Sequence, residues 1–248
     1  MDSRAGELVQ IGLSRGGLLR VCVHPHPGGQ GGLTDLRALL IADVLTRVIE
    51  LNDVQVLVAL AIPDSWPGRV DDLVQPARAL GIHPPAVTRG EGEVRAALGG
   101  SVDVHFAGAG VDGLGGVRVE VGEAAAVPNR LAGDRDPLAL RLALLTRRHY
   151  CGAQFTPGIL DEADATLHRW RDGVAVWARA PSRPMPPDVV RDAYAAFENN
   201  LDTPSVLGQL NRLADDVDVA DGAKFETFVH LDRVLAVDLA RDIGAGPD

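Results

Sequence analysis

Cysteine, lysine and aromatic residues are all scarce in this chain of 248 residues. Two cysteines, Cys22 and Cys151, are too few for a disulfide framework or a four-thiolate zinc site, so we expect reduced thiols. Lys224 is the only lysine, which removes a common catalytic amine from almost the whole chain. No apolar run is long enough to cross a bilayer, and residues 1–7 carry no apolar signal core. We therefore expect a cytoplasmic protein that is soluble and has no membrane partner.

The charge of the chain is acidic and unevenly distributed. The formal net charge is −10, and from Pro157 onward 17 Asp and Glu residues stand against nine Lys and Arg residues. Nucleic-acid binding depends on clustered cations that displace counterions from the phosphate backbone. The acidic second half therefore argues against a nucleic-acid partner.

The first half of the sequence predicts a doubly wound α/β domain. A strand at 18–24 runs into a loop rich in proline and glycine, followed by a helix from about residue 35 to Leu51 and a strand at 54–62 that is apolar on both faces. Short helices are expected at 74–80 and 91–98, and further strands at 102–106 and 117–121. Buried strands alternating with helices are typical of a Rossmann-like parallel sheet.

The second half predicts an α-helical bundle. Apolar residues recur at three- and four-residue steps, as in the seam that contains Leu160, Trp170 and Trp177. Helices are expected at 137–148, 159–178, 188–198, 204–217 (with Thr203 as its cap) and 224–242. We accordingly divide the chain into a domain at 1–135 and a bundle at 136–248.

Five fragments occur here in the order in which they occur in cysteinyl-tRNA synthetases and in the related cysteine ligase of mycothiol biosynthesis. They are Leu36–Leu45, Ala61-Ile62-Pro63-Asp64, Val102-Asp103-Val104-His105, Asp136–Leu142 with His149-Tyr150, and Asn200–Leu207. The sequence thus resembles a member of this class I aminoacyl-tRNA synthetase family. The resemblance implies the class I catalytic fold followed by a helical bundle, and we expect no separate anticodon-binding domain, as in the mycothiol ligase and unlike the synthetases.

The signature residues of that family are missing. Its first strand ends in Cys-Gly-Pro, whose cysteine binds zinc, but the equivalent positions here are Val23-His24-Pro25, with Cys22 one residue out of phase. Its His-Ile-Gly-His motif falls on Gly32-Leu33-Thr34-Asp35, and its Lys-Met-Ser-Lys-Ser loop falls on Ala124–Pro128. The insertion between Asp64 and Asp103 is much reduced. The chain therefore looks like a truncated, motif-degenerate paralogue.

These losses bear directly on the chemistry. Amino-acid activation builds negative charge on phosphate oxygens, and removing one donor to such charge typically costs about 10²–10³ in rate. Losing two histidines and two lysines would cost on the order of 10⁴ or more. We therefore predict no catalytic residues and no active ligase. The resemblance still implies an adenosine nucleotide (ATP or AMP) or an aminoacyl adenylate as the ligand, without a tRNA partner.

A set of residues around the first strand and its loop forms the candidate ligand site. His24 and His26, with the backbone N–H groups of the glycine loop, could bind a phosphate at the start of the following helix, although the charge of Asp35 opposes this. Asp103 and His105 alternate with apolar residues and so share one side of a strand. Arg130 or Arg135 could replace the missing lysines. The complete set of candidates is His24, His26, Gly28, Gly29, Gly31, Gly32, Asp35, Asp103, His105, Gly108 and Arg130.

A metal cluster of His24 and His26 with Cys22, His105 or Asp103 is an alternative use of the same residues. Side chains two apart on a strand share a face, but Pro25 and Pro27 restrict the spacing. We therefore expect a loop histidine and a core thiol, and no zinc.

Three interpretations remain open. The first is a ligand-binding or regulatory pseudoenzyme. The second is an active ATP-dependent aminoacyl ligase with a phosphate site rebuilt from His24, His26 and Arg130 or Arg135. The third is a scaffold whose acidic bundle binds a partner protein.

Overall fold

The computed structural model describes residues 17–26, 31–64, 66–108, 111, 113–126 and 135–244. The chain forms two compact units: unit 1 comprises Met1–Val127 and His149–Phe155, and unit 2 comprises Pro128–Arg148 and Thr156–Asp248. The division into two domains after residue 135 stays a prediction.

Unit 1 is built on a five-stranded sheet in the order β3-β2-β1-β4-β5, in which every pairing is parallel. The strands are β1 (Leu18–His24), β2 (Gln55–Ile62), β3 (Val87–Gly90), β4 (Val104–Ala107) and β5 (Val117–Glu120). The predicted Rossmann-like α/β class is thus confirmed. The strand order reverses between β1 and β4, and ligands of such sheets bind outside the carboxyl ends of the strands at this switch point.

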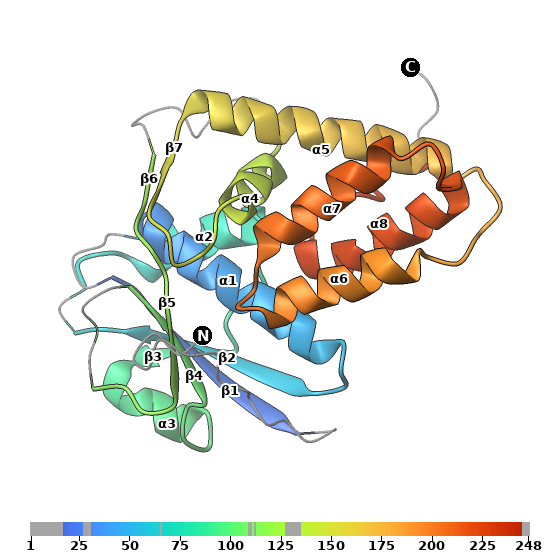
Figure 1. Ribbon diagram of the computed structural model, residues 1–248. Helices are drawn as coiled ribbons and strands as arrows, with labels where there is room; N and C mark the ends of the chain where they lie inside the picture. Colours follow the sequence, from blue (N-terminus) through green and yellow to red (C-terminus); the bar gives the residue numbers. More distant parts are fainter. Residues whose placement is uncertain are drawn as a thin grey trace. The chain divides into compact units, whose positions relative to one another are not determined.

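Helices cover both faces of this sheet (Figure 1). α1 (Leu33–Glu50) packs on β1, β2 and β4 and contacts α2 (Val70–Ala79). The other face is covered by a 3₁₀ turn, η1 (Glu91–Glu93), and the one-turn helix α3 (Val94–Ala97), which packs on β2 and β3. Strands covered on both faces are mostly apolar, which explains the hydrophobic run Val56–Ile62 of β2 and the predominantly apolar sequence of β1, where Arg20 and His24 are the exceptions.

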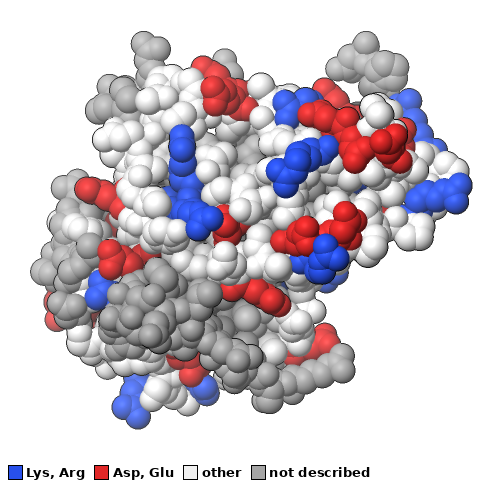
Figure 2. Space-filling model, in the orientation of Figure 1, with Lys and Arg blue, Asp and Glu red and all other residues white. Residues whose placement is uncertain are grey.

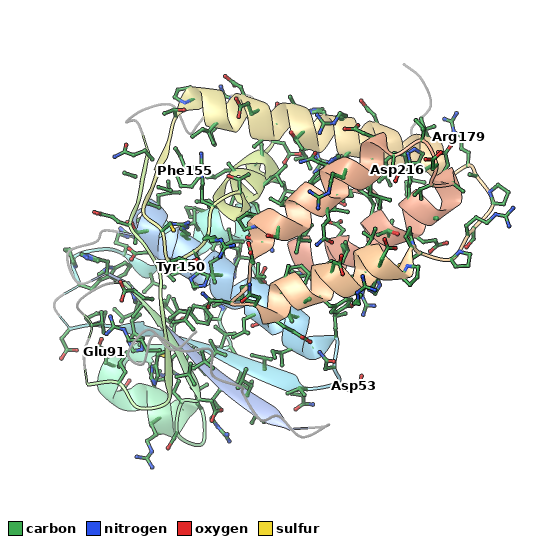
Figure 3. The ribbon with its side chains drawn as sticks, in the orientation of Figure 1. Asp53, Glu91, Tyr150, Phe155, Arg179 and Asp216 are labelled. Carbon is green, nitrogen blue, oxygen red and sulfur yellow. The ribbon has the colours of Figure 1, made fainter. Side chains whose placement is uncertain are left out.

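A second, two-stranded sheet joins distant parts of the sequence. β6 (Ala124–Ala126) pairs in parallel with β7 (Ala153–Phe155), so the segment from His149 to Phe155 returns to unit 1 after a helix of unit 2. Figure 3 labels Tyr150 and Phe155, near the two ends of this segment. Ala124–Ala126, the first three positions aligned with the family's Lys-Met-Ser-Lys-Ser loop, form strand β6.

Gly122 and Arg37 fix the returning segment. The Gly122 amide donates to the carbonyl of His149 at 2.7 Å, and a Cβ at Gly122 would lie 2.7 Å from the carbonyl oxygen of Cys151. Only glycine therefore fits at this position. Arg37, fully buried in α1, donates from Nη1 to the carbonyls of Cys151 (2.7 Å) and Gly122 (3.2 Å).

Unit 2 is helical, as expected. Its helices are α4 (Pro137–Leu145), α5 (Pro157–Trp177), α6 (Pro187–Glu198), α7 (Thr203–Asp215) and α8 (Asp221–Leu235). The predicted seam of α5 is buried, and Trp170 and Trp177 both meet Phe228 of α8 edge-on, with ring centroids 5.7 and 5.1 Å apart. Both tryptophans are thus core residues.

Two helix ends in unit 2 differ from the sequence expectation. α8 ends at Leu235 and does not continue to residue 242, because Ala236 adopts a left-handed conformation and Asp232 accepts from the amides of Val237 and Leu239. α7 is capped by the Asp202 side chain, which accepts from the Ser205 amide; Thr203 instead donates to the carbonyl of Leu145.

Positive and negative side chains are interspersed on the face drawn in Figure 2, and no continuous basic stripe crosses its described residues. Among the described helices, none combines the length and the apolar character needed to span a membrane.

Candidate functional site

Two buried histidines meet at the switch point of the sheet. His24 is the last residue of β1, and His105 lies on β4 in register with Cys22, so the three residues face the same side of the sheet. His24 Nε2 lies 2.9 Å from His105 Nδ1, and both side chains are buried. The structure therefore brings two of the candidate residues, His24 and His105, together at this strand edge.

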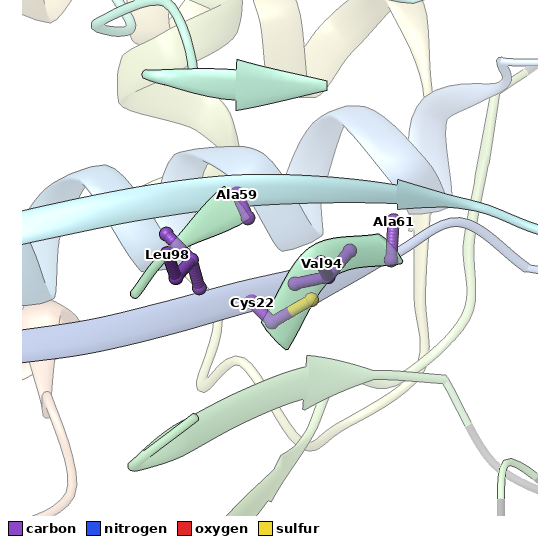
Figure 4. Packing of buried hydrophobic residues seen from close by; sticks show 5 residues of the cluster. All are labelled: Cys22, Ala59, Ala61, Val94 and Leu98. Atoms are coloured by element: carbon purple, nitrogen blue, oxygen red, sulfur yellow. The ribbon is translucent and has the colours of Figure 1, made fainter. Parts of the chain in front are cut away.

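Cys22 completes a compact group with these histidines. One potential ligand atom from each of Cys22, His24 and His105 lies within 4.8 Å of the others. Figure 4 shows the Cys22 sulfur on the face covered by Val94, where it packs with Ala59, Ala61 and Leu98. Burial, reinforced by the negative charge of Glu91, raises the pKa of the Cys22 thiol to about 12. A free Cys22 is thus protonated and unreactive near neutral pH.

His24 is held in its neutral form. Burial disfavours the imidazolium ion and lowers the pKa of His24 to about 4. Its Nδ1 has no hydrogen-bond partner among the described residues. This nitrogen lies 3.7 Å from Oε1 of the Glu91 carboxylate. Glu91 (labelled in Figure 3) lies in η1, directly after β3, and is half exposed. A neutral imidazole with a carboxylate behind it is suited to bind a cation or to relay a proton.

Asp35 occupies the start of α1. Its Oδ1 accepts from the His26 amide at 2.6 Å, and the backbone N–H groups of Gly31 and Gly32 also favour the charged form of this carboxylate. The side chain is buried, and burial raises its pKa despite these hydrogen bonds. Since Gly32 caps α1, Asp35 is the third helical residue reaching back to the cap, as in a capping box. The amides at this helix start, which could bind a phosphate, therefore already face a carboxylate, and that of His26 donates to it.

The remaining loop candidates are only partly described. Gly28 and Gly29, and Arg130 after β6, lie outside the described residues. His26 is exposed, and its ring lies beside Gly108, where an added Cβ would be 3.3 Å from His26 Cδ2. Thus the structure brings His26 together with Gly108 on one side and with Asp35 on the other.

Asp103 and Arg135 are engaged elsewhere. Asp103 precedes β4, and its Oδ2 accepts from the Arg20 amide at 2.8 Å, toward the amino-terminal part of β1. The Asp103 carboxylate thus contacts the backbone of β1 near Arg20. Arg135 belongs to unit 2 and donates from Nε to Asp161 at 2.8 Å.

Sequence reasoning missed Glu91, Arg118 and Arg37. Arg118 is buried on β5 in register with His105, and its Nη2 donates to the carbonyl of Gly108 at 3.1 Å and lies 3.8 Å from Glu120. The available signal for Arg118 was a charged residue between Val117 and Val119 of a predicted strand. Nothing local in the sequence connects Glu91 with His24, since β3 was not predicted.

Comparison with known proteins supports the resemblance over part of the chain. The L-cysteine:1D-myo-inositol 2-amino-2-deoxy-alpha-D-glucopyranoside ligase of Frankia casuarinae is 39% identical over 113 residues, 46% of this chain and 20% of that protein. The ligase of the same name from Mycobacterium tuberculosis is 32% identical over 141 residues, 54% of this chain and 33% of that protein. No family model matches. The aligned part thus spans about a fifth to a third of the length of these relatives.

Proposed function

Because about half of this chain is homologous to the mycothiol cysteine ligases, a cysteinyl-tRNA synthetase-like class I family, we propose that it is a ligand-binding relative that does not activate amino acids. The ligand class is an adenosine nucleotide or an aminoacyl adenylate, bound at the carboxyl ends of β1 and β4. A cytoplasmic location is part of the same proposal.

The observation that carries this proposal is the position of Asp35. Its carboxylate accepts from the His26 amide at 2.6 Å, and the backbone N–H groups of Gly31 and Gly32 also favour its charged form, at the start of a helix of 18 residues. This is the type of helix terminus that binds phosphate in nucleotide-binding folds. A second anion placed there would have to displace the carboxylate and would be repelled by it. A triphosphate is therefore disfavoured at this terminus.

The charges available for catalysis support the same conclusion. Transfer of an adenylyl group requires cations near the developing charge on the phosphate and the departing pyrophosphate. Of the described candidates, His24 is neutral at physiological pH, and Arg135 pairs with Asp161. Asp35 contributes charge of the wrong sign. Binding without turnover is thus the function that these residues favour.

Two measurements on the full chain test this proposal. Pyrophosphate exchange with magnesium, ATP and cysteine should show no turnover above a no-enzyme control. Thermal unfolding should show a stabilising shift with AMP or with a non-hydrolysable cysteinyl-adenylate analogue, since any ligand of the native state raises its stability by mass action.

The alternatives predict different results. Cysteine-dependent exchange would contradict the proposal and support a ligase with a rebuilt phosphate site. Absence of a shift with ATP, AMP and the adenylate analogue would also contradict it, and would favour the scaffold interpretation.

A further inference from the structure

We propose that Cys22, His24 and His105 bind one divalent transition-metal ion, with zinc as the representative ion and Glu91 as the carboxylate that orients His24. This ligand set is not the one implied by the family resemblance, in which the zinc-binding cysteine falls on Val23. It also reverses our expectation from sequence that the chain has no metal site.

The donor set fits this class of metal ion. Thiol and imidazole groups bind zinc and related transition-metal ions, whereas magnesium and calcium prefer oxygen ligands. All three residues project from adjacent parallel strands to the same face, so the backbone itself brings them together. The sheet thus supplies a rigid support of the kind that metal sites require.

The distances are close to those of a tetrahedral site. His24 Nε2 and His105 Nδ1 are 2.9 Å apart, whereas two nitrogens bound to one zinc lie roughly 3.3 Å apart. All three ligand atoms lie within 4.8 Å of one another, and a nitrogen and a sulfur on one zinc lie roughly 3.5 Å apart. Small side-chain rotations therefore convert this group into a coordination site, with a fourth position left for water or an exogenous ligand.

The second nitrogen of His24 gives independent support. Nδ1 is buried, has no hydrogen-bond partner among the described residues and lies 3.7 Å from Glu91 Oε1. If Nδ1 carries the ring hydrogen and faces this carboxylate, Nε2 presents its lone pair toward His105 and Cys22. Metal-bound histidines usually have such a carboxylate behind the opposite nitrogen. Glu91 would thus act as a positioning residue.

The neighbouring charges are compatible with a bound cation. Arg118 lies in register with His105, but its guanidinium donates to the carbonyl of Gly108 and lies near Glu120. Glu91 adds a negative charge on the other side of His24. A metal ion would release the Cys22 proton, and the resulting thiolate would offset half of the ion's charge.

The decisive experiment uses the Cys151→Ser chain, because Cys22 is then the only thiol present. The metal-free protein is titrated with cobalt(II), and the visible and near-ultraviolet spectrum is recorded. We expect one equivalent to bind, with intense tetrahedral d–d bands and a thiolate-to-cobalt charge-transfer band. Added zinc should abolish both signals and raise the melting temperature.

Matched variants in the same background assign the ligands. His105→Gln and Cys22→Ser should each weaken cobalt binding at least 100-fold, and Cys22→Ser should lose the charge-transfer band. Glu91→Gln should weaken binding about 10- to 100-fold, as expected for a group behind a ligand. The controls are His168→Gln and Glu93→Gln, which alter an exposed histidine and an exposed carboxylate of the same turn as Glu91. They should bind as the parent does.

Several results would overturn the proposal. One is the absence of stoichiometric binding to the folded Cys151→Ser protein. Another is a spectrum without a thiolate band, which would place the metal away from Cys22 even if the Cys22 variant fails to fold. Equal affinity in the Glu91→Gln and Glu93→Gln chains would refute the role of Glu91. None of these readouts depends on nucleotide binding, so failure here leaves the proposed function standing.

Discussion

The Asp35 carboxylate accepts a hydrogen bond from the backbone N–H of His26, nine residues earlier, at 2.6 Å. This bond connects the end of the β1 segment to the first turn of α1. A polyphosphate bound at this helix terminus would need the same backbone N–H groups that now face Asp35. The side chain that caps the helix therefore stands where the family's signature motif would bind its ligand.

Asp35→Asn should increase the preference for ATP over AMP. The substitution keeps an acceptor for the loop amides and removes a negative charge near the helix terminus. A unit charge about 5 Å away contributes up to roughly 3 kcal/mol at an effective dielectric constant near 20, so we expect the ratio of the AMP and ATP dissociation constants to rise about tenfold or more. Calorimetric titration of each nucleotide measures this ratio. Glu50→Gln, at the far end of α1, is the control, and an unchanged ratio in Asp35→Asn would contradict the prediction.

Arg37→Met should destabilise the chain by about 2–4 kcal/mol. The buried guanidinium donates to the carbonyls of Gly122 and Cys151, and methionine leaves these acceptors without a charged donor. Urea denaturation of both proteins measures the difference. Arg78→Met alters an exposed arginine on α2 and should change the unfolding free energy by less than about 0.5 kcal/mol. Equal effects of the two substitutions would show that the Arg37 hydrogen bonds contribute little.

Asp232→Ala should destabilise the chain by about 1–3 kcal/mol. The carboxylate accepts from the amides of Val237 (2.8 Å) and Leu239 (2.9 Å), where the chain turns after α8. Its pKa is raised by burial, so removing the charge recovers part of the loss. Asp232→Asn also removes the charge but keeps one acceptor oxygen for these amides, so it should cost less than Asp232→Ala. Thermal unfolding ranks the variants, with the exposed Asp172→Ala as the control.

His230 should make stability fall as the solution becomes acidic. Its pKa is lowered, first by burial and then by the charge of Arg233, while its Nε2 lies 2.9 Å from the hydroxyl of Tyr194. Because the pKa of the folded state is below the ordinary value near 6.5, the unfolded chain takes up the proton first as pH falls. The His230 contribution is fully present above pH 6.5 and declines below it, until the folded-state pKa is passed.

Denaturation of the parent and of His230→Gln between pH 8 and pH 5 isolates this contribution. We expect the stability difference between the two proteins, parent minus variant, to decrease steadily below about pH 6.5. A difference that is constant with pH would show that protonation of His230 is not coupled to folding.

The sequence predicts a helix or strand correctly where the spacing of its apolar residues matches the face that is buried in the structure. β1 and α5 satisfy this condition, because their apolar spacing is the spacing of their buried faces. β3 was missed because it is a four-residue edge strand that ends in Arg89 and Gly90. The end of α8 was misplaced because a side chain of the helix, Asp232, captures amides beyond it. Such contacts have no periodic signal.

The candidate site was predictable only in part, for the same reason. Alternation along β1 and β4 indicates which face of its strand His24 or His105 occupies. Whether the two rings come into contact depends on the register between the strands, which the sequence does not reveal. The contribution of Glu91 depends on where β3 ends, and that of Arg118 on the register of β5.

The return of residues 149–155 to unit 1 has a consequence for dissecting the protein. A fragment that stops after residue 135 would lack β7, the strand partner of β6, and both carbonyl groups contributed by His149 and Cys151. No single cut in the polypeptide separates the two units. Expression of the amino-terminal half alone should therefore give an incompletely folded product, whereas grafting 149–155 onto it through a short synthetic linker restores the missing strand.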